Sequence, residues 1–194
     1  MSTYATEPIR NKQQLRELAQ YFLSKGQYRN YAMIVLGSCT ALRISDLLKL
    51  RWEDVRDTQM GEFFSHITLT EKKTGKHKKI ALSKEAVSAL KQYALHAQAQ
   101  GEYIFSNGRK KEKPISRVQA WRIIKAAVLA VGIKGKISCH SLRKTFGYHA
   151  YLSGKVQPIL LMTIFNHSSF EITKRYLGIT QDEVDRVYLE IELF

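Results

Sequence analysis

The sequence predicts a mainly α-helical domain with one small β-hairpin, an α+β fold. Only three prolines and eleven glycines interrupt the 194 residues, and apolar residues recur mostly at intervals of three and four, the spacing of amphipathic helices. Hydrophobic residues make up 44% of the chain, which is ample for a packed core. We therefore expect a single domain that folds unaided.

Nine segments carry this helical spacing. Ser83 and Glu85 mark the start of the fourth, because a serine followed closely by a glutamate is a common helix start signal. The predicted helices are Lys12–Ser24, Arg29–Thr40, Ile44–Leu50, Lys84–Gln100, Ser116–Val131, His140–Ser153, Gln157–Phe165, Phe170–Leu177 and Gln181–Ile191.

One region departs from the helical pattern. Phe63–Thr70 and Lys78–Leu82 are predicted as two short strands around the turn-prone, lysine-rich sequence EKKTGKH, which together form a β-hairpin with a basic tip. A second basic stretch, Asn107–Lys113 (NGRKKEK), is the nearest approach to a flexible insertion. We find no internal repeat and no low-complexity tract.

The charge of the chain indicates a polyanionic partner. Lysine and arginine number 31 against 17 acidic residues, which gives a net charge of +14 and a pI of about 9.8. The last segment, Gly178–Phe194, is different, with five acidic residues and one arginine. A surface that faces phosphates would not carry this charge, so we expect the C-terminal segment to contact protein.

The sequence contains no signal of export or of metal binding. Its N-terminus lacks an apolar signal core, and its apolar stretches are shorter than the roughly 20 residues of a spanning helix, so we expect a soluble, cytoplasmic protein without membrane contact. Cys39 and Cys139 lack CxxC spacing and are expected as buried thiols. No acidic cluster and no HxxxH or HxH pair is present, so no metal site is predicted.

Three local motifs carry candidate chemistry. Thr40–Asp46 (TALRISD) opens a predicted helix, and His140–Arg143 (HSLR) begins another. Asn166–Ser169 (NHSS) precedes Arg175 and Tyr176 by a short helix. Each motif alone is weak, since an HxxR pair in a capped helix is common by chance.

Taken together, the motifs resemble the tyrosine recombinase, or phage integrase, family. In that family an arginine in T-x-L-R-x-S-(D/E) is followed by a hairpin lysine, an H-x-x-R pair, a G-H-x-S-like histidine and a tyrosine nine residues later. All five elements occur between Arg43 and Tyr176, and independent short motifs multiply in specificity. The resemblance implies a DNA breaking-rejoining catalytic domain that performs site-specific recombination without metal, ATP or another cofactor.

The residue types suit this chemistry. Cleavage of a phosphodiester without metal needs positive charge on the nonbridging oxygens, which the guanidinium groups of Arg43 and Arg143 would supply. The resemblance makes Tyr176 the nucleophile that forms a 3′-phosphotyrosyl bond. His140 is the candidate acid/base for the phenolic proton, and His167 a hydrogen-bond donor to the phosphate.

Supporting residues follow from the same comparison. In the family a hairpin lysine protonates the leaving 5′-oxygen, and Lys73 aligns best with it. Asp46 is expected on the helix face of Arg43, where its carboxylate would hold the guanidinium. Asn166 stands where the family usually has glycine, a change that we expect to affect the backbone near His167. The residues expected to contact DNA phosphates are Lys72, Lys76, Arg109, Lys110 and Lys111.

The resemblance also raises questions of domain organisation and assembly. Most family members carry a helical core-binding domain, and because the arginine motif begins about forty residues after Met1, we expect none here. We assign 1–177 to the catalytic domain and 178–194 to an acidic helix. Its apolar stripe, Val184, Val187, Tyr188 and Ile191, would pack on a neighbouring subunit of a DNA-bound homo-tetramer or fold back on its own domain. Without DNA, we expect the isolated chain to be monomeric.

Two other functions remain open. A catalytically silent DNA-binding regulator could keep the fold, but it would be expected to lose at least one of Arg43, His140, Arg143 and Tyr176, and none is lost. A basic RNA-binding protein would explain the charge but not the five motif elements. We therefore expect an enzyme that acts on double-stranded DNA attachment sites and is associated with the nucleoid.

Overall fold

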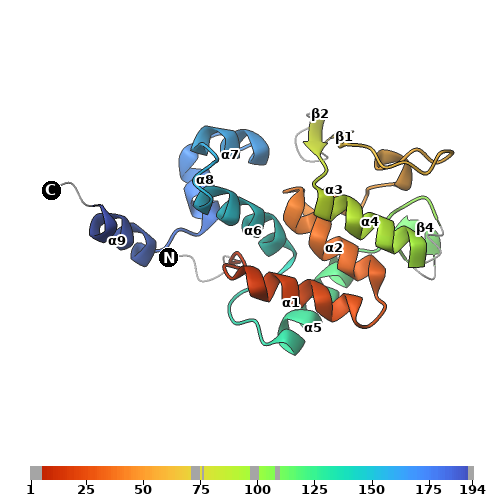
Figure 1. Ribbon diagram of the computed structural model, residues 1–194, viewed down its shortest axis with the longest axis horizontal. Coiled ribbons are helices and arrows are strands. Elements are labelled where there is room, and N and C mark those ends of the chain that lie inside the picture. The colour runs from red at the N-terminus through yellow and green to blue at the C-terminus, as the bar shows by residue number, and fades with distance from the viewer. Residues whose placement is uncertain (1–5, 71–74, 76, 97–100, 108–109, 192–194) are drawn as a thin grey trace.

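The computed structural model describes residues 6–70, 75, 77–96, 101–107 and 110–191 (Figure 1). These residues form a mainly helical fold with two small antiparallel sheets, which confirms the predicted class. The helices are α1 (Lys12–Leu23), α2 (Tyr28–Cys39), α3 (Ile44–Leu47), α4 (Lys84–His96), α5 (Arg117–Val131), α6 (Cys139–Leu152), α7 (Pro158–Phe165), α8 (Phe170–Leu177) and α9 (Gln181–Glu190), with one 3₁₀ turn at Trp52–Asp54. The strands are β1 (His66–Thr70), β2 (His77–Ala81), β3 (Ser106–Asn107) and β4 (Lys110–Pro114).

Helix boundaries follow local capping signals. The side chain of Asn11 accepts hydrogen bonds from two backbone amides in the first turn of α1. Ser116 forms a capping box with Gln119 at the start of α5, which ends at Gly132 in a left-handed conformation. Helix α3 is shorter than predicted, because Lys49 and Leu50 donate to carbonyls three residues back instead of four, and Arg51 then forms an antiparallel bridge with Tyr103.

The two sheets are both hairpins. Strands β1 and β2 pair antiparallel with Ile67 opposite Ile80, and both isoleucines are buried beneath the hairpin. Strands β3 and β4 pair across Ser106 and Pro114. The expectation of a flexible insertion at Asn107–Lys113 was therefore wrong, because its second part belongs to strand β4. The sequence did not indicate this strand, since lysines seldom signal a strand.

The core has two parts. A large apolar cluster joins α1, α2, α4 and α5 with one face of α6. A smaller cluster of Ala41, Leu161, Phe165 and Leu177 lies under α7 and α8 and packs against Tyr176. Figure 1 shows α9 beyond α8 at one end of the molecule.

Two glycines permit close packing around α6. A Cβ on Gly37 of α2 would lie 2.7 Å from the side chain of Leu142. A Cβ on Gly147 of α6 itself would lie 2.5 Å from the Phe165 ring. Helix α6 is therefore held tightly between α2 on one side and the α7–α8 pair on the other.

Among the described residues, no helix combines the length and the apolar character needed to cross a membrane. Cys39 and Cys139 are free thiols, as expected, but both are only partly buried. Burial nevertheless raises the pKa of the Cys139 thiol to about 11.

Candidate active site

Helices α6 and α8 and the turn between α7 and α8 bring four of the predicted site residues together. The Tyr176 ring makes edge contacts with the rings of His140 and His167, at centroid distances of 4.9 and 5.0 Å. It also packs at 4.9 Å against Phe165, a buried residue at the end of α7. The predicted nucleophile and both predicted histidines therefore share one site, although His140 lies far from the other two in the sequence.

Arg143 is the central cation of this site and is only 2% exposed. Its Nε donates to the Tyr176 hydroxyl at 3.0 Å, and its Nη2 donates to the Phe165 carbonyl at 2.8 Å. Its Nη1 donates to the carbonyl of Ala41. A buried guanidinium needs such partners, because an uncompensated charge away from water is strongly unfavourable.

Arg43 reaches the site from a strained turn. Ala41, which is fully buried, has a left-handed backbone with φ of 54°, a conformation that is costly for a residue with a side chain. This turn directs the Ala41 carbonyl to Arg143 and places Arg43 at the N-cap of α3 with extended ψ of 144°. The charge of Arg43 contributes to the pKa values of both His140 and Tyr176.

Arg43 precedes α3 as its N-cap, and Asp46 is the third residue of that helix. Asp46 is 6% exposed, and its Oδ1 accepts a hydrogen bond of 3.5 Å from the Ser45 hydroxyl. Support of the arginine by this buried carboxylate stays a prediction.

His167 is oriented by the turn that links α7 to α8. Asn166 ends α7 in a left-handed conformation with φ of 51°, which asparagine tolerates better than most residues, and glycine best of all. The backbone amide of His167 then donates to the Met162 carbonyl at 3.0 Å. Its Nδ1 is 3.0 Å from the hydroxyl of Thr173, a fully buried residue that the sequence analysis missed.

The two central titratable groups are both held in their neutral forms. Burial of the ring lowers the pKa of His140 to about 4, and the nearby charges of Arg143 and Lys144 act in the same direction, although one side of the residue is open to solvent. Burial raises the pKa of Tyr176 to about 12 against the opposing charge of Arg143. At neutral pH His140 can therefore accept a proton, and Tyr176 retains one.

A groove of about 800 Å³ lies beside this cluster. Arg43 and His140 line it together with Lys49 and Arg117, two basic residues that the sequence analysis did not select. Arg117 is the first residue of α5, directly after the Ser116 cap. Their signal in the sequence is weak, because single basic residues on helices are common.

The predicted hairpin residues are only partly described. Lys72, Lys73, Lys76 and Arg109 lie outside the described residues, as do the side chains of Lys110 and Lys111. The hairpin itself is attached next to His167, since Lys78 of β2 donates through Nζ to the carbonyl of Ile164 in α7. A second groove of about 590 Å³ separates β2 from α7, with His77 and Lys79 on one side and His167 on the other.

Comparison with known proteins gives a consistent result. The chain matches the model of the phage integrase family over residues 10–183. It is 39% identical over 185 residues to the probable integrase/recombinase YoeC of Bacillus subtilis, a match that covers 95% of this chain and 96% of YoeC. Tyrosine recombinase XerD of Corynebacterium glutamicum is 30% identical over 165 residues, covering 82% of this chain and 51% of XerD. The chain thus spans nearly all of YoeC but about half the length of the Xer relatives.

Solved structures share the fold at low sequence identity. XerA recombinase superposes with a TM-score of 0.76 at 22% identity, covering 96% of this chain and 66% of that one. XerH recombinase bound to a palindromic difH substrate gives a TM-score of 0.75 at 16% identity, covering 97% and 54%. A lambda integrase dimer bound to a COC′ core site gives 0.68 at 19% identity, covering 100% and 65%.

Proposed function

Because the chain belongs to the phage integrase family, we propose that it is a tyrosine recombinase that cuts and rejoins DNA through a 3′-phosphotyrosyl intermediate on Tyr176. The observation that carries this proposal is the convergence of His140, Arg143 and His167 on the Tyr176 ring and hydroxyl. One tyrosine surrounded by two imidazoles and a buried guanidinium suits nucleophilic attack on a phosphodiester.

The proposed cleavage step uses only side chains of this chain. The Tyr176 oxygen attacks phosphorus while His140, neutral at pH 7, takes the phenolic proton. Arg43 and Arg143 neutralise charge that develops on the nonbridging oxygens. His167, held by Thr173, donates a hydrogen bond to the same phosphate.

The departing 5′-oxygen must also receive a proton. We assign this donation to Lys73, which lies between β1 and β2 in the sequence. Strand β2 is attached near His167 through Lys78. The phosphotyrosyl bond conserves the energy of the cleaved phosphodiester. Attack by a 5′-hydroxyl of another strand then rejoins the DNA and returns Tyr176 to its starting form, so the cycle needs no ATP.

The substrate of this reaction would be duplex DNA carrying an attachment site. The solved relatives XerH and lambda integrase are bound to DNA in their crystals, and the net charge of +14 suits a phosphate backbone. The basic segments with Lys72, Lys76, Arg109, Lys110 and Lys111 would extend the contact with phosphates. The reaction would take place on nucleoid DNA in the cytoplasm.

We further propose that the active form is a homo-tetramer on DNA, with residues 1–177 as catalytic domain and 178–194 as the contact to a neighbour. The apolar residues of α9 and its C-cap support this assignment, because Val187, Tyr188 and the C-cap Ile191 are 55%, 80% and 56% exposed. Single exposed apolar side chains are common, but a stripe on one short helix favours a protein partner.

Covalent trapping tests the proposed function. Nicked duplexes tiled across the DNA that flanks the gene are incubated with the protein, and SDS-resistant protein–DNA adducts are collected and sequenced. We expect adducts at one short sequence, abolished by Tyr176→Phe and retained by Tyr188→Phe, which removes the same hydroxyl from an exposed residue of α9. If the protein binds that DNA without any adduct, it is a catalytically silent regulator instead.

A further inference from the structure

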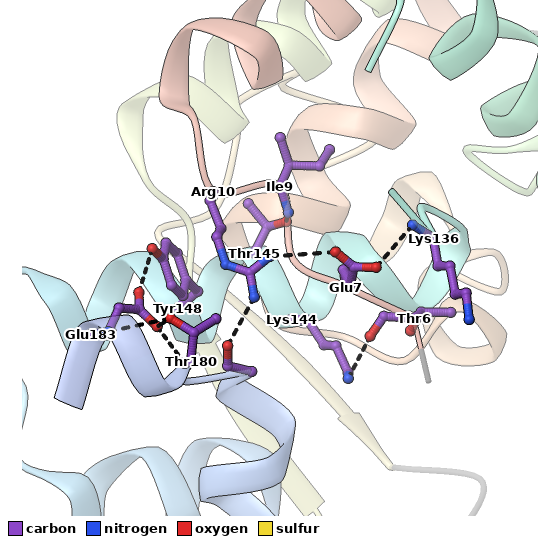
Figure 2. Close-up of polar contacts among 11 residues, drawn as sticks. Thr6, Glu7, Ile9, Arg10, Lys136, Lys144, Thr145, Tyr148, Thr180 and Glu183 are labelled. Carbon is purple, nitrogen blue, oxygen red and sulfur yellow. Dashed lines mark hydrogen bonds and ion pairs between the residues drawn. The ribbon is translucent and has the colours of Figure 1, made fainter. Parts of the chain in front are cut away.

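The segment before α1, Thr6–Arg10, lies along α6 and is bonded to it through its backbone (Figure 2). The Ile9 amide donates to the Thr145 hydroxyl at 2.8 Å, and the Ile9 carbonyl lies 3.0 Å from Nε2 of His149. The Ile9 side chain is 1% exposed and belongs to the main core. This N-terminal segment is therefore a fixed part of the domain.

The first residues of this segment are hydrogen-bonded to the turn before α6. The Glu7 amide donates to the Lys136 carbonyl at 3.0 Å, and the Lys136 amide donates to the Glu7 carboxylate at 3.2 Å. These reciprocal bonds leave little freedom for the segment to slide along α6. The carboxylate of Glu7 also lies 3.5 Å from the guanidinium of Arg10, an i,i+3 pair within the segment.

The first connection to the nucleophile passes through Lys144. This lysine follows Arg143 on α6, is 7% exposed, and donates through Nζ to the Thr6 carbonyl at 2.7 Å. Its Nζ also lies 5.4 Å from the centroid of the Tyr176 ring, within the range of a cation–π contact. One buried ammonium thus joins the N-terminal segment to the ring of the nucleophile.

The second connection passes through Arg10 to the end of α8. Arg10 Nη2 donates to the Gly178 carbonyl at 2.9 Å, and its guanidinium lies 5.6 Å from the ring centroid of Tyr148. Gly178 ends α8 in a left-handed conformation with φ of 67°, two residues after Tyr176. A Cβ at Gly178 would lie 3.3 Å from Pro8, so the segment packs directly on this turn.

The start of α9 is fixed to the same surface. The Tyr148 hydroxyl donates to Glu183 at 2.7 Å, while Glu183 also closes a capping box with Thr180 (Figure 2). Burial opposes ionisation of Glu183, but the hydrogen bonds from Thr180 and Tyr148 and the charge of Arg10 lower its pKa. The chain on the C-terminal side of Tyr176 is therefore held by α6 as well as by Arg10.

We propose that the N-terminal segment is a positioning element of the active site, and that Arg10 and Lys144 are the residues through which it fixes the Tyr176 nucleophile. The inference rests on the proposed function, because only a nucleophile gains from such precise placement. Arg10 fixes the end of α8, and Lys144 fixes the ring that projects from it. A misplacement of about 1 Å at a reacting atom can lower a rate by roughly 100-fold.

The test separates cleavage from DNA binding. Single-turnover adduct formation at saturating nicked duplex is compared with the dissociation constant for the same duplex without a nick, using the full chain. For Arg10→Ala we expect cleavage to slow by roughly 10- to 100-fold, with a dissociation constant close to that of the wild type. Arg10→Lys, which keeps the charge and one donor, should recover a large part of the rate.

Arg16→Ala is the matched control, because it removes one positive charge from an exposed position on α1. Lys144→Met, which keeps the length of the side chain, should slow cleavage in the same way if Arg10→Ala fails to fold. Equal cleavage rates for Arg10→Ala, Lys144→Met and Arg16→Ala would overturn the inference and leave the proposed function intact. Absence of any wild-type adduct would instead overturn the proposed function. A loss confined to DNA affinity would assign Arg10 to phosphate binding and also overturn the inference.

Discussion

The Nε of Arg143 donates a hydrogen bond of 3.0 Å to the hydroxyl of Tyr176. The same guanidinium donates to the Ala41 and Phe165 carbonyls, so one side chain connects the turn before α3, the end of α7 and helix α8. The geometry of the site and the packing of these elements consequently depend on one residue. Changes at Arg143 should affect stability as well as catalysis.

Arg143→Lys is expected to abolish cleavage and to destabilise the fold. An ammonium cannot satisfy three acceptors arranged around a planar fork, and a hydrogen bond to a charged group contributes about 1.5–3 kcal/mol. We expect the free energy of unfolding in urea to fall by about 2–4 kcal/mol. Arg122→Lys, on the exposed side of α5, is the control and should leave stability unchanged. A stable Arg143→Lys protein would show that the buried contacts contribute little.

Gly147→Ala is expected to disturb the site by steric pressure. The new methyl group would lie 2.5 Å from the buried Phe165 ring, so Phe165 must move, and with it the carbonyl bonded to Arg143. Overpacking of this kind costs about 1–3 kcal/mol. Thermal unfolding and adduct formation should both be impaired.

The control for Gly147 is Gly26→Ala. Gly26 has φ of 65° and no neighbouring atom within 4 Å of a new Cβ. This variant should show only the backbone strain of a left-handed alanine, without loss of cleavage rate. If both variants cleave DNA at the wild-type rate, close packing of α6 on α7 is not needed for catalysis.

Much of the fold could be predicted because its signals are local. The spacing of apolar residues predicted α8 at its observed bounds, Phe170–Leu177, and most other helices to within a few residues. The predicted end of α3 failed, since the bridge between Arg51 and Tyr103 is a long-range contact. Strand β4 was missed for a similar reason: its partner is the short strand β3, which has no apolar alternation of its own.

The site residues were found by motif, but their supports were not. His140, Arg143, His167 and Tyr176 were identified from the resemblance of their motifs to the family, and the fold brings them together. Thr173 holds His167 from one turn before the tyrosine, and no sequence pattern distinguishes it from an ordinary helix threonine. The contact of Arg10 with Gly178 joins the two ends of the chain, which local patterns cannot reveal.

The stability of the DNA-free protein should depend on pH through His140. Burial and nearby positive charge lower the pKa of His140 to about 4 from 6.5, so the unfolded chain binds this proton more readily than the folded one. The contribution of His140 is complete above pH 6.5 and is lost as the pH falls towards 4. We expect wild type to lose more stability than His140→Gln between pH 7.5 and 4.5, as measured by urea unfolding.

His66→Gln, which removes an exposed imidazole at the start of β1, is measured in parallel as the control for loss of a histidine. Parallel curves for His140→Gln and wild type would mean that solvent at the open side of His140 cancels the effect of the surrounding charges. Because neutral His140 is the proposed base, this outcome would also weaken its assigned role.

Assembly on DNA should depend on the exposed face of α9. Tyr188 is 80% exposed and Val187 is 55% exposed, while the first turn of α9 is attached to α6 through Glu183. Burial of one large apolar side chain contributes about 1.5–3 kcal/mol, so Tyr188→Asp should weaken association of DNA-bound subunits by roughly 10- to 100-fold. Sedimentation with a duplex that carries the recovered site measures this change.

Asp182→Asn, which alters charge on the exposed first turn of α9, is the matched control and should assemble normally. Binding of a single subunit to a half-site should be the same in both variants, because the acidic helix is not expected to face phosphate. If Tyr188→Asp assembles like the wild type, α9 does not contact a neighbour through this face. If it instead loses thermal stability as a monomer, the stripe packs on its own domain, in contrast to its exposure in the structure.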